Sequence, residues 1–318
     1  MNQATSKRLM TMGYAAVGIT SFLLGLFPTV SKPVISTVNP LFFTSICALA
    51  PFVIFSPLSL SSSKKGQAKK NSQSPASKGL GQRIYGIVLL SACVGGIVGP
   101  LAYFFGLQSS TAADASLLAN GEMVFTIVIA SLAFHEKLNR VGLAAVLLVS
   151  IGVIVVATNL QFSKTTLDFA APGHLLILFA GLCWGMDNNI ITYASERIDV
   201  VRFIVFRSAI VAPVLLFISY LSIPLPSNPS ELGRIFLIGV VVFGGSLYFN
   251  FLALKWLGAI RSTLIFPISS LFGLAAAYLV LNESIGFYQI VSIGIIFIGI
   301  YLMTRTESVR REFSYDLP

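Results

Sequence analysis

The chain has 318 residues, of which 55% are hydrophobic and only 10% are charged, and its mean hydropathy is +0.86. Soluble domains carry about 25% charged residues, so this composition excludes a water-soluble globular protein and predicts that lipid is the solvent. A net charge of +9 would indicate a nucleic-acid partner in a soluble protein. Here the basic residues fall in short segments between apolar runs, so we expect no nucleic-acid partner.

The first apolar run extends from Leu9 to about Ile35 and follows a short basic start. It is too long for a signal-peptide core and has no small-residue cleavage pattern. We therefore interpret it as the first transmembrane segment. Pro28 and Pro33 are expected to kink or end it near its second half.

Nine further apolar runs have the length needed to span a bilayer. They lie at roughly 40–59, 84–107, 112–134, 139–158, 172–194, 201–222, 234–255, 259–281 and 286–304. The predicted fold class is therefore an all-α polytopic membrane protein with ten transmembrane helices. Connections as short as Gln108–Thr111 force neighbouring helices to run antiparallel.

The lysines and arginines predict the orientation. If the N-terminus is cytoplasmic, seventeen of them lie inside, three lie outside (Lys32, Lys164 and Arg234) and Arg207 lies within the membrane. This bias sets membrane topology, so we expect cytoplasmic termini and a location in the cell (plasma or inner) membrane. The Ser/Lys-rich segment 60–83 is expected to be a flexible cytoplasmic loop, with a docking role as the alternative.

Two stretches of the chain resemble each other. Asp114–Leu138 aligns without a gap with Arg261–Ile285, 147 residues later, and Glu136 falls on Glu283. Leu24-Gly25 lies 160 residues before Trp184-Gly185, because the polar loop lengthens the first half by about thirteen residues. We predict two repeats, 9–158 and 172–304, and a cytoplasmic tail at 305–318.

Each predicted repeat contains five helices, which is an odd number, so the two repeats should cross the membrane in opposite senses. Inverted repeats are the signature of secondary transporters, which alternate access around a site near the membrane midplane. The repeat therefore favours a transporter and does not identify the substrate.

The chain also resembles a known family, the drug/metabolite transporter (DMT) superfamily and in particular its EamA-type branch. The resemblance rests on Trp184-Gly185, on Arg207 in the seventh predicted helix, and on LLANGEMVFTIVIASLAFHEKL with its counterpart LIFPISSLFGLAAAYLVLNESI. Met123 stands where the family usually has proline, and Leu24 and Cys47 replace the tryptophan and arginine of the first half. The resemblance implies export or exchange of small polar metabolites.

Glu122 is the leading candidate for a functional residue. It lies about halfway along the fourth predicted helix, roughly 15 Å from either membrane surface. A carboxylate at that depth should face the bundle interior or a wet cavity, because contact with lipid is costly. We predict that Glu122 binds substrate and couples transport to protons; the alternative is a buried carboxyl that only joins helices.

A second group of candidates lies in the sixth and seventh predicted helices. Asp187 and Asn188 form a polar cluster, and Trp184 shares a helix face with Asn188 because the two are four residues apart. These side chains are expected to line a cavity or to form an interhelical hydrogen-bond network. Arg207 lies about two turns inside its helix, so one alternative is that it reaches the cytoplasmic surface. If it points inward, we expect it to pair with Asp187 or Glu122, with binding of a substrate carboxylate as the other alternative.

The family resemblance implies that Tyr103, Tyr248 and Asn250 also line the cavity, since they lie on the third and eighth predicted helices. Lys32 is expected to anchor the first helix at the membrane interface, with a gate charge as the alternative. Glu136 and Glu283 precede tight turns, and we expect them to accept hydrogen bonds from the amides that begin the following helices.

Three cysteines and two histidines show no metal-binding or disulfide spacing, so we expect no metal and no cofactor. We also predict that the protein is not an enzyme. His135 and His174 fall on opposite sides of the membrane in the predicted topology, and neither is adjacent to a credible nucleophile. A membrane channel and a homodimer are left open.

The substrate class follows from the balance of charges. Sugar-phosphate and nucleotide-sugar exchangers, the alternative, need several cations to meet phosphate groups. This chain has one deep cation, Arg207, and two deep acids, Glu122 and Asp187. We therefore expect a small-molecule substrate that is an amino acid or an amino-acid-like compound.

Overall fold

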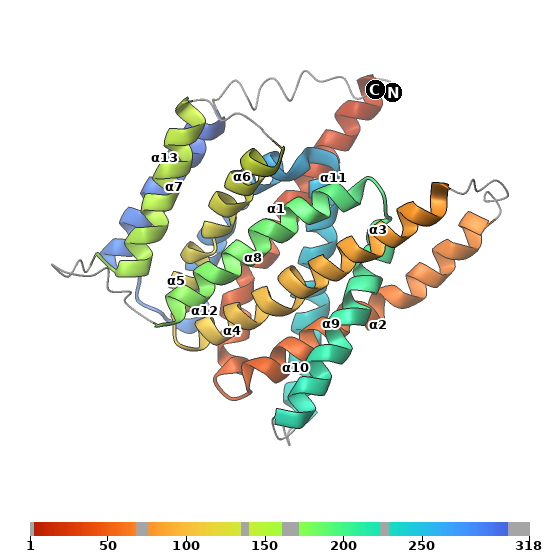
Figure 1. The fold of residues 1–318 in the computed structure, drawn as a ribbon. Helices are drawn as coiled ribbons and strands as arrows, with labels where there is room; N and C mark the ends of the chain where they lie inside the picture. The colour runs from red at the N-terminus through yellow and green to blue at the C-terminus, as the bar shows by residue number, and fades with distance from the viewer. Residues whose placement is uncertain (1–2, 68–75, 135–139, 161–171, 223–228, 305–318) are drawn as a thin grey trace.

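The computed structural model describes residues 3–67, 76–134, 140–160, 172–222 and 229–304, and all regular structure in these ranges is helical (Figure 1). The first half contains α1 (Gln3–Ile35), α2 (Pro40–Gln67), α3 (Ala76–Ser91), η1 (Ala92–Val98), α4 (Gly99–Gln108), α5 (Ala112–Leu118), α6 (Gly121–Phe134) and α7 (Arg140–Thr158). The second contains α8 (Pro172–Ser195), α9 (Val200–Ser222), α10 (Pro229–Ile238), η2 (Gly239–Gly244), α11 (Gly245–Ile265), α12 (Ile268–Leu281) and α13 (Phe287–Thr304).

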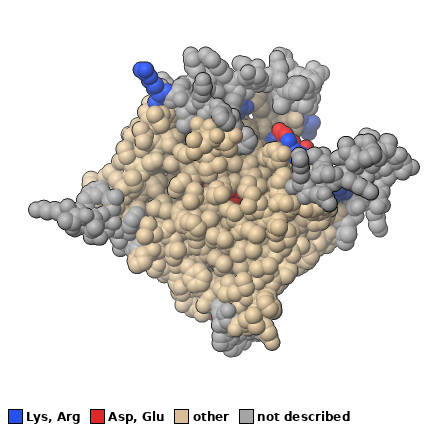
Figure 2. Space-filling view, in the orientation of Figure 1, with Lys and Arg blue, Asp and Glu red and all other residues tan. Residues whose placement is uncertain are grey.

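Nine helical segments among the described residues are long and apolar enough to cross a membrane, and a tenth, shorter apolar helix covers Phe287–Leu302. These ten segments match the ten predicted apolar runs. Figure 2 shows one face of the molecule as a broad, nearly uninterrupted uncharged surface, with the visible Lys and Arg side chains near its edges. Such a surface suits contact with lipid, and it confirms the prediction of an all-helical polytopic membrane protein.

Four of the ten described spans contain irregular backbone. The third and eighth spans each contain a π-helical segment, η1 beginning at Ala92 and η2 beginning at Gly239, and 239 − 92 = 147. The fourth span is broken between α5 and α6 at Ala119, and the ninth is broken between α11 and α12 at Phe266, where 266 − 119 is again 147. The irregular backbone therefore recurs at the same place in each half.

The two breaks have the same hydrogen bonding. The amide of Glu122 donates to the carbonyl of Ala119 at 3.0 Å, and the amide of Ser269 donates to the carbonyl of Phe266 at 2.8 Å. Both bonds join residues three apart, the spacing of a 3₁₀ turn. Glu122 and Ser269 are themselves 147 positions apart, so a tightened turn is duplicated along with the sequence.

The halves pack through corresponding helix pairs: α1 packs on α11 and α12, and α8 packs on α4 and α6. A Cβ on Gly25 of α1 would lie 2.7 Å from Phe272 Cβ, and a Cβ on Gly185 of α8 would lie 2.7 Å from Phe125 Cβ. Both α1 and α8 therefore approach the adjoining half-helix closely where they carry glycine. Two further pairs, α2 with α9 and α7 with α13, close the bundle (Figure 1).

The helix that follows each connection after α1 and α8 begins with the same type of cap. Asn39 Oδ1 accepts a hydrogen bond from the amide of Leu41 at 2.9 Å, and Asp199 Oδ1 accepts one from Val201 at 3.0 Å. Asparagine and aspartate favour this position because the side chain satisfies an amide that has no partner within the helix. The 160-residue spacing of Asn39 and Asp199 is thus a structural repeat.

Candidate transport cavity

A central cavity lies between the two halves and consists of two adjoining chambers with empty volumes of about 540 and 580 Å³. Both chambers are lined by Leu24, Phe27, Glu122 and Trp184. We call the first the aromatic chamber, because its other lining residues include Tyr103, Met123 and Phe266. We call the second the polar chamber, because its other lining residues include Asp187, Asn188, Arg207, Ser246 and Asn250.

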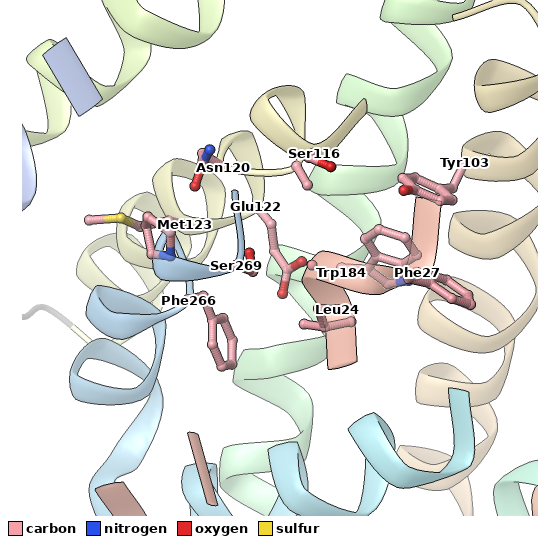
Figure 3. Close-up of a pocket in the computed structure, with 13 residues that line it drawn as sticks. Leu24, Phe27, Tyr103, Ser116, Asn120, Glu122, Met123, Trp184, Phe266 and Ser269 are labelled. Carbon is pink, nitrogen blue, oxygen red and sulfur yellow. The ribbon is translucent and has the colours of Figure 1, made fainter. Parts of the chain in front are cut away.

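Glu122 lies where the two chambers meet. It is in the first turn of α6, directly after the break at Ala119, rather than in the middle of a continuous helix as the sequence indicated. A carboxylate in this position is favoured by the partial positive charge of the helix N-terminus. Figure 3 shows its carboxyl group pointing into the cavity, toward Leu24 and Trp184. The Asn120-Gly121 dipeptide, a typical turn signal, could have revealed the break.

A chain of amide hydrogen bonds connects Glu122 with two predicted site residues. Asn188 Nδ2 donates to Glu122 Oε1 at 2.6 Å, and Asn250 Nδ2 donates to Asn188 Oδ1 at 3.2 Å. The three side chains come from α6, α8 and α11, so the chain crosses between the halves. It leaves the second carboxylate oxygen of Glu122 without a hydrogen bond from this network.

Asp187 and Arg207 form an ion pair in the wall of the polar chamber. Arg207 Nη1 lies 2.7 Å from Asp187 Oδ2, and each residue is only 4% exposed. Ser91 completes the group: its hydroxyl donates to Asp187 Oδ1 at 2.5 Å and accepts from Arg207 Nη1 at 3.1 Å. Among the expected placements of Arg207, this geometry favours pairing with Asp187. Sequence reasoning missed Ser91.

The π-helical segment η1 makes room for this ion pair. A Cβ on Gly95 would fall 2.0 Å from Asp187 Oδ2, and a Cβ on Gly96 would fall 3.3 Å from Arg207 Nε. Only glycine lets the backbone of η1 approach the two charged groups so closely. The Gly95-Gly96 pair therefore positions the charges in addition to packing the helices.

The predicted aromatic residues divide into two places. The ring of Tyr103 packs nearly parallel to that of Phe27, with centroids 5.9 Å apart, and lies 5.2 Å from that of Trp184. These three rings line the aromatic chamber. Tyr248 lies elsewhere: its ring stacks on Phe55 at 5.6 Å and is in the lining of neither chamber. The structure thus separates Tyr248 from the other seven predicted site residues.

Equivalent positions of the two halves line the same cavity. Tyr103 and Asn250 are 147 residues apart, and Leu24 and Trp184 are 160 apart. Phe27 and Asp187 also differ by 160, and all six of these positions, together with the pair Glu122 and Ser269, lie in the cavity wall. The backbone positions are duplicated, whereas the side chains differ.

A second polar group, which we call the far-end cluster, lies where α1 ends and α5, α8 and α13 begin. Its members are Lys32, Asp114, His174, Glu283, Tyr288 and Gln289. Sequence analysis assigned no role to Asp114, Tyr288 or Gln289, since each lies among apolar residues without a recognisable motif. The structure brings them together because three helix N-termini converge there.

Glu283 has a capping role in this cluster, but not for the expected helix. Its two carboxylate oxygens accept hydrogen bonds from the amides of Ala112 and Ala113, both at 2.9 Å. These amides begin α5 in the other half, whereas the sequence predicted the start of α13. Glu136, the equivalent residue, lies outside the described residues, as does His135.

Lys32 also has a more specific position than a membrane-interface anchor. Its Nζ donates hydrogen bonds to the carbonyls of Leu107, at 3.2 Å, and Ser110, at the end of α4. A cation at a helix C-terminus satisfies carbonyls that have no partner in the helix. The end of α1 is thereby joined to the end of α4.

No group of three or more metal-ligating side chains occurs within the part of the chain that the structure describes. The ten apolar segments and the central polar cavity at two helix breaks define a membrane transporter as the class of protein. Irregular backbone at membrane depth is tolerated where it lines a cavity, and transporters place substrate sites at such breaks.

The EamA-like transporter family matches residues 11–158 and 171–305. The chain therefore belongs to the EamA-like transporter family, within the DMT superfamily, and is a multi-pass membrane transporter rather than an enzyme. The separate match of each half agrees with a duplicated repeat.

Two relatives and one solved structure are similar to the chain. An "Uncharacterized transporter" of Methanothermobacter thermautotrophicus is 26% identical over 92% of this chain and 85% of its own length. A "Probable amino-acid metabolite efflux pump" of Salmonella typhimurium is 28% identical over 65% of this chain and 71% of its own length. A crystal structure superposes with a TM-score of 0.62 at 17% identity, covering 92% of this chain and 98% of the other. This last likeness concerns the fold alone.

Proposed function

We propose that the chain is a secondary transporter that exports or exchanges amino acids or amino-acid-like compounds by alternating access. In this proposal the two five-helix halves, 9–158 and 172–304, cross the membrane in opposite senses and both termini are cytoplasmic. The bias of lysine and arginine supports the orientation. Figure 1, in which α1 begins at the same end of the bundle where α13 finishes, is consistent with it.

The substrate class is inferred from one difference between the charged residues of the cavity: two of them pair with each other and the third has no charged partner among the described residues. Arg207 is already paired with Asp187 at 2.7 Å, so these two charges largely cancel. Glu122 faces the cavity with one amide partner, Asn188, and no cation among the lining residues of either chamber pairs with it. A ligand with an ammonium group would supply the missing positive charge.

The remaining walls suit the rest of an amino-acid-like molecule. Asn250 and Ser246 offer neutral hydrogen-bonding groups in the polar chamber. Trp184, Tyr103 and Phe27 offer an apolar surface for a side chain in the aromatic chamber. The printed name of the Salmonella typhimurium relative agrees with this substrate class. A phosphorylated substrate is less favoured, because Arg207 is the one cation in the described cavity lining and it is neutralised.

We further propose that Glu122 carries the proton that couples transport to a gradient. A lone carboxyl at membrane depth can exchange between a proton and a cationic ligand, because each neutralises the same charge. Glu122 also lies where the two chambers meet, so a change of access from one side to the other would expose it in turn to each solution.

The test is counterflow in proteoliposomes that contain the purified protein. Candidate amino acids are first selected by the increase in melting temperature that they cause, since a ligand stabilises the state to which it binds. We expect internal unlabelled amino acid to accelerate the uptake of labelled amino acid. Uptake without such trans-stimulation would indicate a channel. Accumulation of a sugar phosphate in place of amino acids would overturn the proposed substrate class.

A further inference from the structure

The far-end cluster contains two buried, ionisable side chains that face each other. Asp114, in the first turn of α5, is 3% exposed, and His174, in the first turn of α8, is 1% exposed. His174 Nε2 lies 3.7 Å from Asp114 Oδ2. The pair is separate from the central cavity, since neither residue lines either chamber.

The second nitrogen of His174 fixes the tautomer. His174 Nδ1 lies 3.0 Å from the carbonyl oxygen of Ala157, in the last turn of α7. A carbonyl oxygen can only accept a hydrogen bond, so Nδ1 carries a hydrogen. In the neutral ring, Nε2 would then present a lone pair to the carboxylate of Asp114. Protonation of Nε2 removes this repulsion and makes the ring a cation that attracts the carboxylate at this distance.

The partners of Asp114 favour its ionised form and so place the proton on His174. Gln289 Nε2 donates to Asp114 Oδ1 at 2.8 Å, and the hydroxyl of Tyr288 donates to the same oxygen at 3.1 Å. The other described charged groups near the pair are Lys32 and Glu283. Lys32 bonds to carbonyls at the end of α4, and Glu283 bonds to the amides of α5, so both already have partners.

The pair borders an open hollow through which protons can reach it. This hollow, with an empty volume of about 760 Å³, is lined by Asp114 and His174 and also by Ser110 and Asn159. Its other lining residues are polar as well: Lys32, Gln108, Ser109, Thr111 and Tyr288. A hollow with a polar wall suits water.

We propose that His174 and Asp114 form a second proton-binding site, distinct from Glu122, whose occupancy keeps the far end of the bundle closed. With the proton bound, the imidazolium joins α5 to α8 and, through Ala157, to α7. The carboxylate joins α5 to α13 through Gln289 and Tyr288. When the proton leaves, the lone pair of Nε2 faces the carboxylate and the contact between α5 and α8 weakens.

This inference goes beyond the proposed function. The proton site itself requires neither an amino-acid substrate nor coupling at Glu122. Only its effect on closure rests on alternating access. The sign follows from the chemistry: closure is favoured at low pH and is lost as pH rises through the titration of the pair. One proton changes the ratio of open to closed states by at most about tenfold per pH unit.

Proton binding can be measured directly, because the chain has two histidines. In the variant His135→Gln, prepared with histidine whose ring nitrogens carry ¹⁵N, His174 is the source of all histidine NMR signals. We expect Nδ1 to remain protonated across the pH range while Nε2 gains a proton as pH falls. A neutral ring with its hydrogen on Nε2, or a ring that does not titrate, would overturn the proposal.

Closure can be measured by labelling a cysteine behind the far-end cluster. Ser116 lines the aromatic chamber and is 5% exposed, so Ser116→Cys, in a chain whose three native cysteines are replaced, reports access from that end. The reference is a second chain that carries both Ser116→Cys and His174→Gln. We expect the rate of reaction with an impermeant maleimide, divided by the rate in this reference chain, to increase with pH. Equal pH dependence in both chains would contradict closure by the pair.

Two controls separate this proposal from the proposed function. Glu122→Gln should leave the pH dependence of labelling unchanged, because Glu122 is not part of the far-end cluster. His135→Gln should also leave it unchanged. If Glu122→Gln alone abolishes the pH dependence, Glu122 and not His174 is the responsible group. If His174→Gln does not fold, the NMR titration still decides whether the proton site exists.

Discussion

The break between α5 and α6 and the break between α11 and α12 have the same backbone and different chemistry. Each contains a tightened turn, closed by the amide of Glu122 in one and of Ser269 in the other. Both residues line the aromatic chamber. A duplicated backbone therefore carries a carboxyl in one half and a hydroxyl in the other, so the tightened turn forms with either side chain.

The ion pair shows the same contrast more strongly. The repeat offsets of 147 and 160 residues give the equivalent positions in the other half. Ile238 is equivalent to Ser91, Phe27 to Asp187 and Cys47 to Arg207. The residues of the ion-pair group are charged or polar, and their equivalents are not. The fold is thus maintained with or without the charges. Their presence on one wall only gives the cavity a polar side and an apolar side, which suits an amphipathic metabolite.

The largest effect is expected for Glu122→Gln. The amide cannot release or bind a proton, so uptake driven by a proton gradient should fall to the level of empty vesicles while counterflow is partly retained. The measurement is labelled uptake with and without a gradient, over a range of pH. Ser269→Ala, at the equivalent position, is the matched control and should retain driven uptake. Driven uptake by Glu122→Gln equal to that of the natural chain would refute coupling at this residue.

The second-largest effect concerns the buried ion pair. Arg207→Met leaves Asp187 buried without a counter-charge and should reduce stability by roughly 3–5 kcal/mol, seen as a lower melting temperature in detergent. Adding Asp187→Asn should recover part of this loss, because the unpaired charge is removed. The equivalent Cys47→Ala should have a smaller effect. Single and double variants of equal stability would show that the two charges are not coupled.

The third-largest effect is a loss of stability that should differ between the two π-helical segments, η1 and η2. Gly95→Ala would force a methyl group against the carboxylate of Asp187 and should cost about 1–3 kcal/mol, as overpacking does. At Gly244, in η2, an added Cβ would meet its nearest atom only at 3.2 Å. Gly244→Ala should therefore cost less. Thermal unfolding of both variants in detergent measures the difference, and equal losses would contradict the special role of Gly95.

The smallest effect distinguishes the two predicted tyrosines. Tyr103→Ala removes a ring from the aromatic chamber and should weaken substrate binding by about 0.5–1.5 kcal/mol, or roughly two- to tenfold in KM. Tyr248→Ala removes a ring that stacks on Phe55 outside the chambers, so KM should not change even if stability falls. Concentration-dependent counterflow measures both. A larger change in KM for Tyr248→Ala would place that residue at the substrate site.

Most of the cavity residues could be predicted from sequence, because the free-energy cost of exposing a polar side chain to lipid depends on that side chain and its apolar neighbours along the chain. Glu122, Asp187 and Arg207 stand out within apolar runs, and such groups must turn inward whatever the tertiary arrangement. Their exact partners could not be found in this way. Ser91 is one of many serines in apolar helices, and its contact with Asp187 depends on how η1 approaches α8.

The sequence by itself determined the apolar segments, the duplication and the position of Glu122 within an apolar segment, since hydropathy and spacing act along a single chain. The tertiary structure alone decided which helix ends meet. It placed Glu283 on the amides of α5 in the other half, joined His174 to Asp114, and put Glu122 at the start of a half-helix. The Glu283 contact uses backbone amides, which every residue type supplies, and the His174–Asp114 contact joins side chains 60 residues apart in the chain, so no local sequence pattern identifies either.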